Sequence, residues 1–124
     1  MRVPILKQGS YLIASIQGAL TDTDSSHLQE EFVERVGAAR TRGVIIDVTA
    51  LDVMDSLASR TLRDLAQVSR LRGAETVIVG IQPEVAITMV QMGLSLESVA
   101  TALDLEEGLA LLDRRTKGDT RRDR

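Results

Sequence analysis

The residues best placed for chemistry are three aspartates that follow one apolar stretch of the chain. Asp47 lies near the end of the apolar run at 43–48, and Asp52 and Asp55 come soon after it. Carboxylates at this position could hold Mg²⁺, because ligands favour the carboxyl ends of strands in an open α/β sheet and Mg²⁺ prefers oxygen ligands. No phosphate-binding loop or basic activating partner accompanies them, so loop solvation and helix capping are the ordinary interpretation.

Ser56 is the most informative hydroxyl, because it follows Asp55 and precedes an apolar helical pattern. Serine is a favoured N-cap residue, and capping is the ordinary structural role at this position. The alternative is that the hydroxyl accepts a phosphate, which the free N–H groups and dipole of a helix N-terminus would accommodate. A phosphate would add about −1.5 to −2 charges beside Asp55. Because Ser59 and Thr61 follow closely, spacing alone leaves the acceptor open.

The composition excludes several kinds of site. The chain has 124 residues, no cysteine and one histidine, His27. These counts exclude a disulfide framework, a thiol nucleophile, a thiolate metal site and a His-rich metal site. Tyr11 and Phe32 are the only aromatic residues and the formal net charge is −3, which argues against a surface that stacks nucleic-acid bases. The glycines form no nucleotide-binding pattern, so we predict no cofactor, no bound metal and no nucleic-acid partner.

The sequence contains no membrane or targeting signal that we can identify. Its first residues include one arginine but no long apolar region and no cleavage signal. No apolar run approaches the roughly 18 residues that a membrane helix needs. We therefore expect a cytoplasmic protein without a membrane partner.

The hydrophobic pattern predicts strands that alternate with helices. Such an order favours one α/β domain with a mainly parallel sheet, and the first two strands can form a hairpin at one edge. We expect the domain to span 1–115 and a flexible polar tail to span 116–124. Asp22, Thr23 and Asp24 are candidate caps for the first helix. The expected strands are 3–7, 11–17, 43–48, 75–80 and a short one within 96–101, and the expected helices are about 22–40, 56–72, 83–92 and 105–115.

The predicted helix at 56–72 carries two apolar stripes. One stripe is expected to face the sheet and consists of Ala58, Leu62, Leu65, Ala66 and Ser69. The other lies about 100° around the helix and consists of Leu57, Val68 and Leu71. In a monomer the second stripe would be partly exposed, which suggests contact with another chain. A single broad buried face is the alternative interpretation.

Three segments together resemble a known family. They are IIDVTALDVMDS at 45–56, GIQPEVA at 80–86 and TALDLEEGL at 101–109. These motifs are similar to those of the STAS domain of anti-sigma factor antagonists, and within that superfamily to the RsbS family of stressosome scaffold proteins. The resemblance covers about residues 3–112, and it implies a single STAS domain with a mixed, mainly parallel sheet and about four helices.

The resemblance also implies a function without an active site in this chain. The phosphoacceptor of the family falls on Ser56. The unmodified protein would sequester an RsbT-like serine kinase together with RsbR-like STAS proteins in a large assembly. Phosphorylation would release the kinase to start a stress-signalling partner switch, and a PP2C-like phosphatase would reverse it. The expected phosphosite neighbourhood and partner contacts are Asp55, Leu57, Ser59, Val68 and Leu71.

Two positions depart from the family pattern. Leu57 stands where an aromatic residue is expected after the serine, which affects partner choice more than the acceptor. In R-type relatives an additional acceptor lies near the start of the first helix, and it falls here on Asp22, with Thr23 adjacent. A serine/threonine kinase cannot modify an aspartate.

Two other functions remain open at this point. The first is a small anti-anti-sigma factor that binds an anti-sigma kinase directly, without a large assembly. The second is a small-molecule sensor or a metal-dependent enzyme that uses Asp47, Asp52 and Asp55. The size of the complex distinguishes the first from a scaffold, and tight ligand binding that is lost in Asp55→Asn would support the second.

Overall fold

The sheet adds its strands in the order in which they occur along the chain. The structure is a computed structural model that describes residues 3–38, 41–93 and 99–122. The sheet order is β1-β2-β3-β4-β5, with β1 antiparallel to β2 and all other neighbours parallel. The strands are β1 (Ile5–Gln8), β2 (Tyr11–Ser15), β3 (Gly43–Asp47), β4 (Glu75–Val79) and β5 (Ala100–Ala102), and the helices are α1 (Asp22–Ala38), α2 (Ser56–Leu71), α3 (Pro83–Gln91) and α4 (Leu105–Arg122). The predicted α/β fold with an N-terminal hairpin edge is therefore confirmed.

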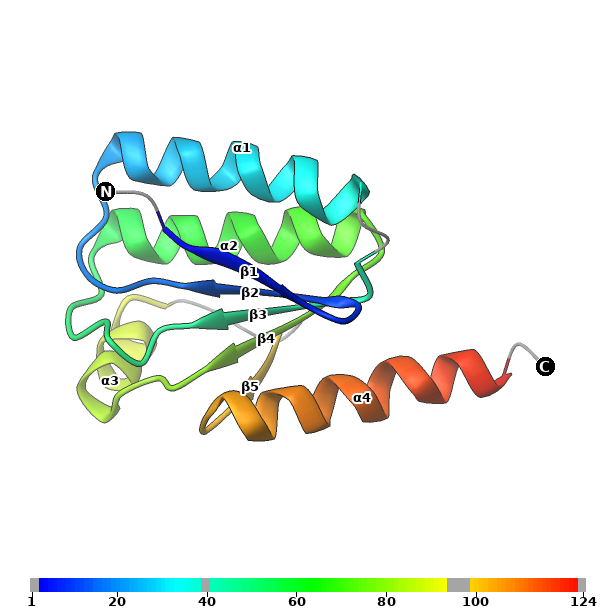
Figure 1. Ribbon diagram of the computed structural model, residues 1–124. Coiled ribbons are helices and arrows are strands. Elements are labelled where there is room, and N and C mark those ends of the chain that lie inside the picture. The colour runs from blue at the N-terminus through cyan, green and yellow to red at the C-terminus, as the bar shows by residue number, and fades with distance from the viewer. Residues whose placement is uncertain (1–2, 39–40, 94–98, 123–124) are drawn as a thin grey trace.

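The helices cover the two faces of the sheet unequally. α1 and α2 lie on one face, α4 lies on the other, and α3 lies at the end of the sheet where α2 begins (Figure 1). The larger apolar cluster lies under α1, α2 and α3 and includes Leu12, Phe32, Ile46 and Leu62. The smaller cluster joins β2, β3 and β4 to Leu112 of α4. Because β3 and β4 are buried on both faces, they are continuous apolar runs rather than alternating ones.

α1 and α2 run side by side and begin at the same end of the sheet (Figure 1). The hydroxyl groups of Ser25 and Thr61 lie 2.7 Å apart in the buried contact between the two helices. Thr61 also donates to the carbonyl of Leu57 at 2.7 Å. These bonds satisfy buried polar groups and fix the relative position of the two helix N-termini.

The cap of α1 differs from the three candidates taken from the sequence. The backbone N–H of Asp24 donates to the Thr21 hydroxyl at 3.0 Å, and the backbone N–H of Thr21 donates to the Asp24 carboxylate at 3.1 Å. This reciprocal pair is a capping box in which Thr21, and not Asp22, Thr23 or Asp24, is the N-cap. The bond from the Thr21 backbone lowers the pKa of the Asp24 carboxyl group below its usual value.

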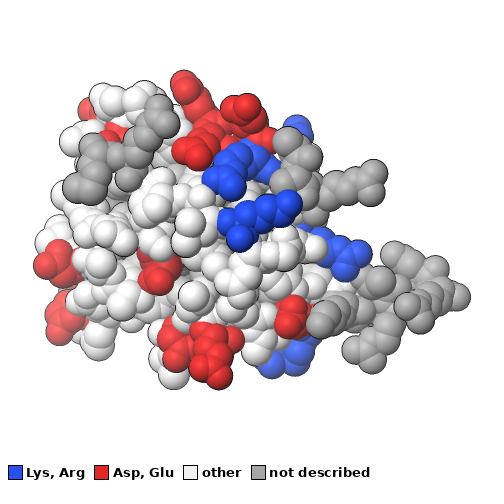
Figure 2. All heavy atoms as spheres, in the orientation of Figure 1, with Lys and Arg blue, Asp and Glu red and all other residues white. Residues whose placement is uncertain are grey.

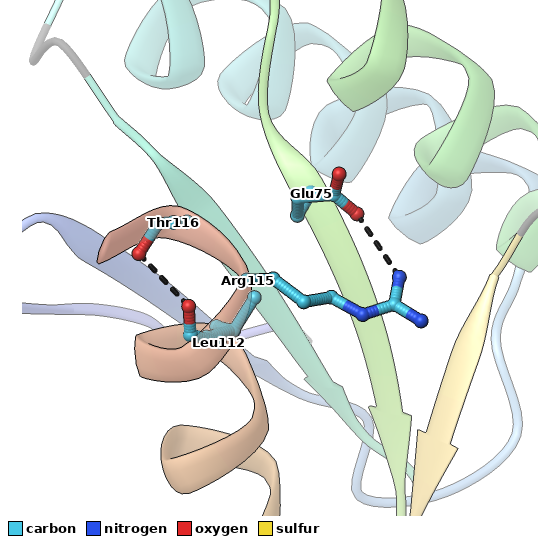
Figure 3. Close-up of polar contacts among 4 residues, drawn as sticks. All are labelled: Glu75, Leu112, Arg115 and Thr116. Carbon is cyan, nitrogen blue, oxygen red and sulfur yellow. Dashed lines mark hydrogen bonds and ion pairs between the residues drawn. The ribbon is translucent and has the colours of Figure 1, made fainter. Parts of the chain in front are cut away.

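The last helix is longer than predicted, whereas the other elements differ from prediction by one or two residues. β5 begins at Ala100, opposite Val77 and within the predicted range 96–101, and it ends one residue beyond that range; residues 96–98 lie outside the described residues. α4 continues to Arg122, so its predicted end at Arg115 is wrong. Thr116 explains the longer helix, because it is buried and its hydroxyl donates to the Leu112 carbonyl at 2.8 Å (Figure 3). The flexibility of the tail stays a prediction.

The two stripes of α2 divide as the first interpretation requires. Ala58, Leu62, Leu65, Ala66 and Ser69 are all buried against the sheet and neighbouring helices. Leu57 and Val68 are half-buried, whereas Leu71 is 86% exposed. The second stripe is therefore only partly covered, and its exposure is concentrated at the C-terminal end of the helix.

Candidate functional site

The loop between β3 and α2 is fixed by apolar anchors. Leu51 and Met54 are buried in the larger cluster, and the Leu51 N–H donates to the Val48 carbonyl at 2.9 Å. Val53, between these anchors, points outward and is 64% exposed. The loop therefore holds its two anchors inside the fold and presents the residues between and after them to solvent.

The first residues of this loop are held against the segment that follows β4. The Asp47 carboxylate accepts from the backbone N–H of Thr49 at 2.9 Å and from its hydroxyl at 2.6 Å. The Gln82 side-chain amide donates to the Thr49 carbonyl at 2.7 Å. Gly80 has φ of +79°, and a Cβ there would lie 2.0 Å from the Thr49 hydroxyl oxygen. Glycine is therefore required both for the backbone conformation and for the close approach.

Asp55 caps α2, which corrects the capping role that the sequence allowed for Ser56. The Asp55 carboxylate accepts from the Ala58 N–H at 2.8 Å, and the Asp55 backbone is extended, as an N-cap requires. Ser56 is the first helical residue and is exposed. Because the cap is supplied by its neighbour, the Ser56 hydroxyl is available at a helix N-terminus for another role.

The two other hydroxyl groups near this helix start are not accessible in the same way. Ser59 is 6% exposed and its hydroxyl lies 3.8 Å from the sulfur of Met92. Thr61 is fully buried between α1 and α2. Burial thus distinguishes Ser56 from the alternatives that spacing could not separate.

The surface around Ser56 is acidic and partly apolar. Asp52 and Asp55 are exposed beside it, and Val53 lies between them in the sequence. Met92, which contacts Ser59, is 43% exposed at the end of α3. Sequence reasoning did not identify Val53 or Met92 as part of this surface. For Val53 the sequence offered one signal, an apolar residue that lies between two acids in a loop.

The predicted phosphosite neighbourhood is divided by the length of α2. Asp55, Leu57 and Ser59 surround Ser56 in the first turn. Val68 and Leu71 lie three to four turns farther along, about 18–22 Å away at 1.5 Å per residue. A contact role for Val68 and Leu71 stays a prediction, and the surface to which they belong is separate from the surface at Ser56.

The three aspartates that could have formed a metal site do not act together: two of them bind different backbone groups, and the third is exposed in the loop. Asp47 binds Thr49, Asp55 caps α2, and Asp52 lies exposed in the loop between them. Within residues 3–38, 41–93 and 99–122, no group of three His, Cys, Asp or Glu side chains is arranged to hold a metal ion. In the same part of the chain, no helix is both long and apolar enough to span a bilayer.

The comparison with protein families matches residues 2–108 to the STAS domain. Two curated relatives from Bacillus subtilis (strain 168) are the RsbT co-antagonist proteins RsbRA and RsbRD. RsbRA is 28% identical over 97 residues and RsbRD is 26% identical over 98 residues, which are 78% and 79% of this chain. In both cases the match spans 35% of the relative, so the chain corresponds to about one third of their length.

Two solved structures cover nearly the whole chain. An RsbS from Moorella thermoacetica with a serine-to-glutamate substitution is 36% identical, with a TM-score of 0.83, and covers 93% of this chain and 97% of its own. A chain from a structure titled as the molecular architecture of the stressosome is 35% identical, with a TM-score of 0.79, and covers 90% and 97%. By the family match over 2–108 and by this likeness to RsbS, the chain belongs to the STAS domain family.

Proposed function

We propose that this protein is a non-enzymatic scaffold and phospho-switch of a cytoplasmic, stressosome-like assembly, with Ser56 as its phosphoacceptor. In its unmodified form it would hold an RsbT-like serine kinase together with RsbR-like STAS proteins. Phosphorylation would release the kinase to start a partner switch in stress signalling, and a PP2C-like phosphatase would restore the first state.

One observation carries the assignment of the acceptor: Ser56 is exposed at the first residue of α2 while Asp55 supplies the cap. Modification of Ser56 therefore removes no bond on which the helix depends. The phosphoryl group would pass from ATP to the Ser56 hydroxyl oxygen, the hydroxyl proton would pass to a base of the kinase, and ADP would leave. Burial argues against the same reaction at Ser59 or Thr61.

The charge of the site supports its use as a switch. A phosphate would add about −1.5 to −2 charges to a surface on which Asp52 and Asp55 are already exposed. Arg60 lies four residues after Ser56 on an exposed part of α2, within the spacing at which helix side chains pair. The modified helix start could thus be held by Arg60 while it repels or no longer fits a partner that had packed against a neutral hydroxyl.

The partner assignment rests on the comparisons. The curated relatives are named co-antagonists of RsbT, and the similar solved structures are an RsbS and a stressosome chain. These names motivate a kinase of the RsbT type and RsbR-like STAS proteins as the partners to test.

The decisive test is the intact mass of the protein after incubation with ATP and the kinase encoded nearest its gene. Wild type, Ser56→Ala and Ser26→Ala would be compared, since Ser26 is an exposed serine near the start of the neighbouring helix. We expect one added phosphate on wild type and on Ser26→Ala and none on Ser56→Ala. Equal modification of Ser56→Ala would refute the acceptor. An unmodified wild type, with a kinase active on another substrate, would refute the switch.

A plain anti-anti-sigma factor shares this acceptor but differs in the size of its complexes. A scaffold should co-elute with an RsbR-like protein as a particle of megadalton order. The plain antagonist should remain in a small complex with its kinase, whatever STAS protein is added.

A further inference from the structure

The two most exposed large apolar side chains in the described part of the chain lie beside opposite ends of the same edge strand. Leu71 is 86% exposed and Leu103 is 81% exposed. Leu103 directly follows β5, and Leu71 lines a groove that includes Ala100 at the start of β5. Single exposed leucines are ordinary, but these two have surroundings of opposite charge.

The groove beside Leu71 lies between the C-terminal end of α2 and the start of β4 and β5. Its volume is about 920 Å³, and Ala66, Ala74 and Val99 contribute apolar lining. Arg70 and Arg115 line the same groove. Arg115 forms an ion pair with Glu75 at 3.3 Å, with both side chains nearly half exposed (Figure 3). The groove thus combines apolar side chains with two arginines, of which Arg115 is paired with Glu75 and Arg70 is exposed beside Leu71.

The corner at Leu103 has the complementary composition. Asp104, Glu106 and Glu107 follow Leu103 at the start of α4 and are exposed. The Asp104 carboxylate accepts from the Glu107 N–H at 2.9 Å, and the Glu107 carboxylate accepts from the Leu103 N–H at 3.3 Å. Asp104 thus caps α4, the Glu107 carboxylate binds the residue before the cap, and Leu103 is presented beside exposed acidic residues.

The same separation of charge extends over the visible face of the molecule. In Figure 2 acidic side chains lie at the end of the sheet where α2 and α4 begin and also over α1, where they adjoin basic ones, and most basic side chains lie toward the opposite end. The carboxyl end of the sheet carries Asp47, Asp52, Asp55 and Glu84 with the arginine Arg60, and the amino end carries Arg42, Arg70, Arg72 and Arg115 with the acid Glu75. When two copies meet head-to-tail, the acidic end of one copy lies against the basic end of the next. The two ends of a single copy are too far apart to attract each other in this way.

We propose that a second copy of this chain docks head-to-tail, with its Leu103 corner in the groove beside Leu71. Leu103 would pack on the apolar lining, and Glu106 and its acidic neighbours would face Arg70 and Arg115. The proposal rests on the scaffold role proposed above for its biological purpose, while the contact itself requires neither kinase nor phosphate. Because each copy keeps one free groove and one free corner, the contact propagates into a ring or an open chain.

The contact is tested by sedimentation velocity of the purified full chain over a concentration series, without kinase or partner. The groove variant carries Arg70→Glu and Leu71→Ser, and the corner variant carries Leu103→Ser and Glu106→Lys. Every one of these side chains is exposed, so we expect the fold to be retained, as circular dichroism would check. The matched control is Leu6→Ser with Lys7→Glu, an exposed leucine and cation on β1.

We expect wild type and the control to associate. Each variant should raise the dissociation constant about tenfold or more, because it lacks a leucine that the contact would bury and reverses one charge of an opposite-charge pair. The informative sample is an equimolar mixture of the two variants. One intact corner and one intact groove remain in the mixture, so it should form pairs that do not grow further.

Four results would overturn the proposal. In the first, the wild type stays monomeric throughout the series, and in the second, both variants still associate. In the third, the mixture remains monomeric although each variant is folded. In the fourth, an RsbR-like STAS protein binds in the groove and a second copy of this chain does not. None of these results depends on phosphorylation of Ser56, so failure of this contact and failure of the proposed switch are distinguishable.

Discussion

At the scale of single residues, Asp55 caps α2, and the Ser56 hydroxyl is therefore not needed as a cap. The carboxylate of Asp55 satisfies the Ala58 N–H, and the neighbouring hydroxyl is left exposed. Spacing predicted the helix start, but it could not assign the cap, because Asp and Ser are equally good N-cap residues. The backbone conformation settles this assignment, and a sequence does not report it directly.

A charge at position 56 should weaken the retention of the kinase. Ser56→Asp places a carboxylate where the partner is expected to pack against a hydroxyl, and we expect a loss of about 100-fold in affinity, which is about 3 kcal/mol. This loss of affinity is measured by calorimetric titration of the kinase into wild type, Ser56→Asp and the exposed control Ser26→Asp. Equal affinity for wild type and Ser56→Asp would show that the partner does not contact this residue.

Loss of the cap should reduce stability without removing the acceptor. Asp55→Ala leaves the Ala58 N–H without its side-chain acceptor and is expected to lower the free energy of unfolding by about 1 kcal/mol. Urea denaturation of Asp55→Ala and of Asp52→Ala, an exposed loop acid nearby, provides the comparison. A cost as large in Asp52→Ala would mean that general loss of negative charge, rather than the cap, determines stability.

At the scale of elements, the capping box of α1 makes part of the stability depend on pH. The Thr21 N–H lowers the pKa of Asp24 in the folded state, so the unfolded state binds a proton more readily at acid pH. The resulting stabilisation is present above the unfolded pKa of about 4 and is lost as pH falls through the lower folded pKa. The difference in stability between wild type and Asp24→Asn should therefore shrink as the pH falls below about 4. In thermal melts a constant difference, or the same trend in Asp22→Asn, would contradict this account.

The far end of α4 depends on contacts that the sequence conceals. The Tyr11 hydroxyl donates to the Asp113 carboxylate at 2.5 Å and lies 3.1 Å from the Thr116 hydroxyl. Burial, followed by the Asp113 hydrogen bond, raises the pKa of the Tyr11 phenol above its usual value. This contact joins residues about a hundred positions apart, and for that reason polar composition after Arg115 suggested a tail where the structure has a helix.

Removal of the phenol should therefore destabilise the packing of α4 on the sheet. We expect Tyr11→Phe to lower the free energy of unfolding by about 1.5 kcal/mol, the low end of the range for a hydrogen bond to a charged group, because the contact is only partly buried. Amide hydrogen exchange should accelerate at Leu112 and Thr116 more than in α1. Uniform acceleration through the whole chain would mean that Tyr11 contributes to global stability without a local role in α4.

The parts of the site that sequence predicted are those with local causes. The strand before the loop, the helix after it and the place of Ser56 at the helix start follow from apolar runs, β-branched residues and cap residues in one short stretch. The contact of Met92 with Ser59 and the packing of Gly80 on Thr49 join different segments. Neither leaves a periodic pattern in the chain, so neither could be predicted.

At the scale of the whole molecule, the separation of charge gives self-association a dependence on salt. The Debye length falls from about 10 Å at 0.1 M to about 3 Å at 1 M ionic strength, so attraction between exposed charges on two copies is screened. We expect association to weaken as sodium chloride rises, while the groove variant, which reverses the charge of Arg70, shows a smaller change. Stronger association of wild type at high salt would indicate an apolar contact without the charge match.

The sequential strand order has a consequence for synthesis of the chain. Once residues up to 93 have left the ribosome, β1 to β4 and α1 to α3 hold nearly all of the larger cluster. The opposite face still lacks Leu112 and the rest of α4, so Ile13, Ile45 and Val77 remain uncovered until the last elements emerge. A nascent chain thus exposes an apolar sheet face until α4 emerges, and that interval is when a chaperone or a premature neighbour would engage it.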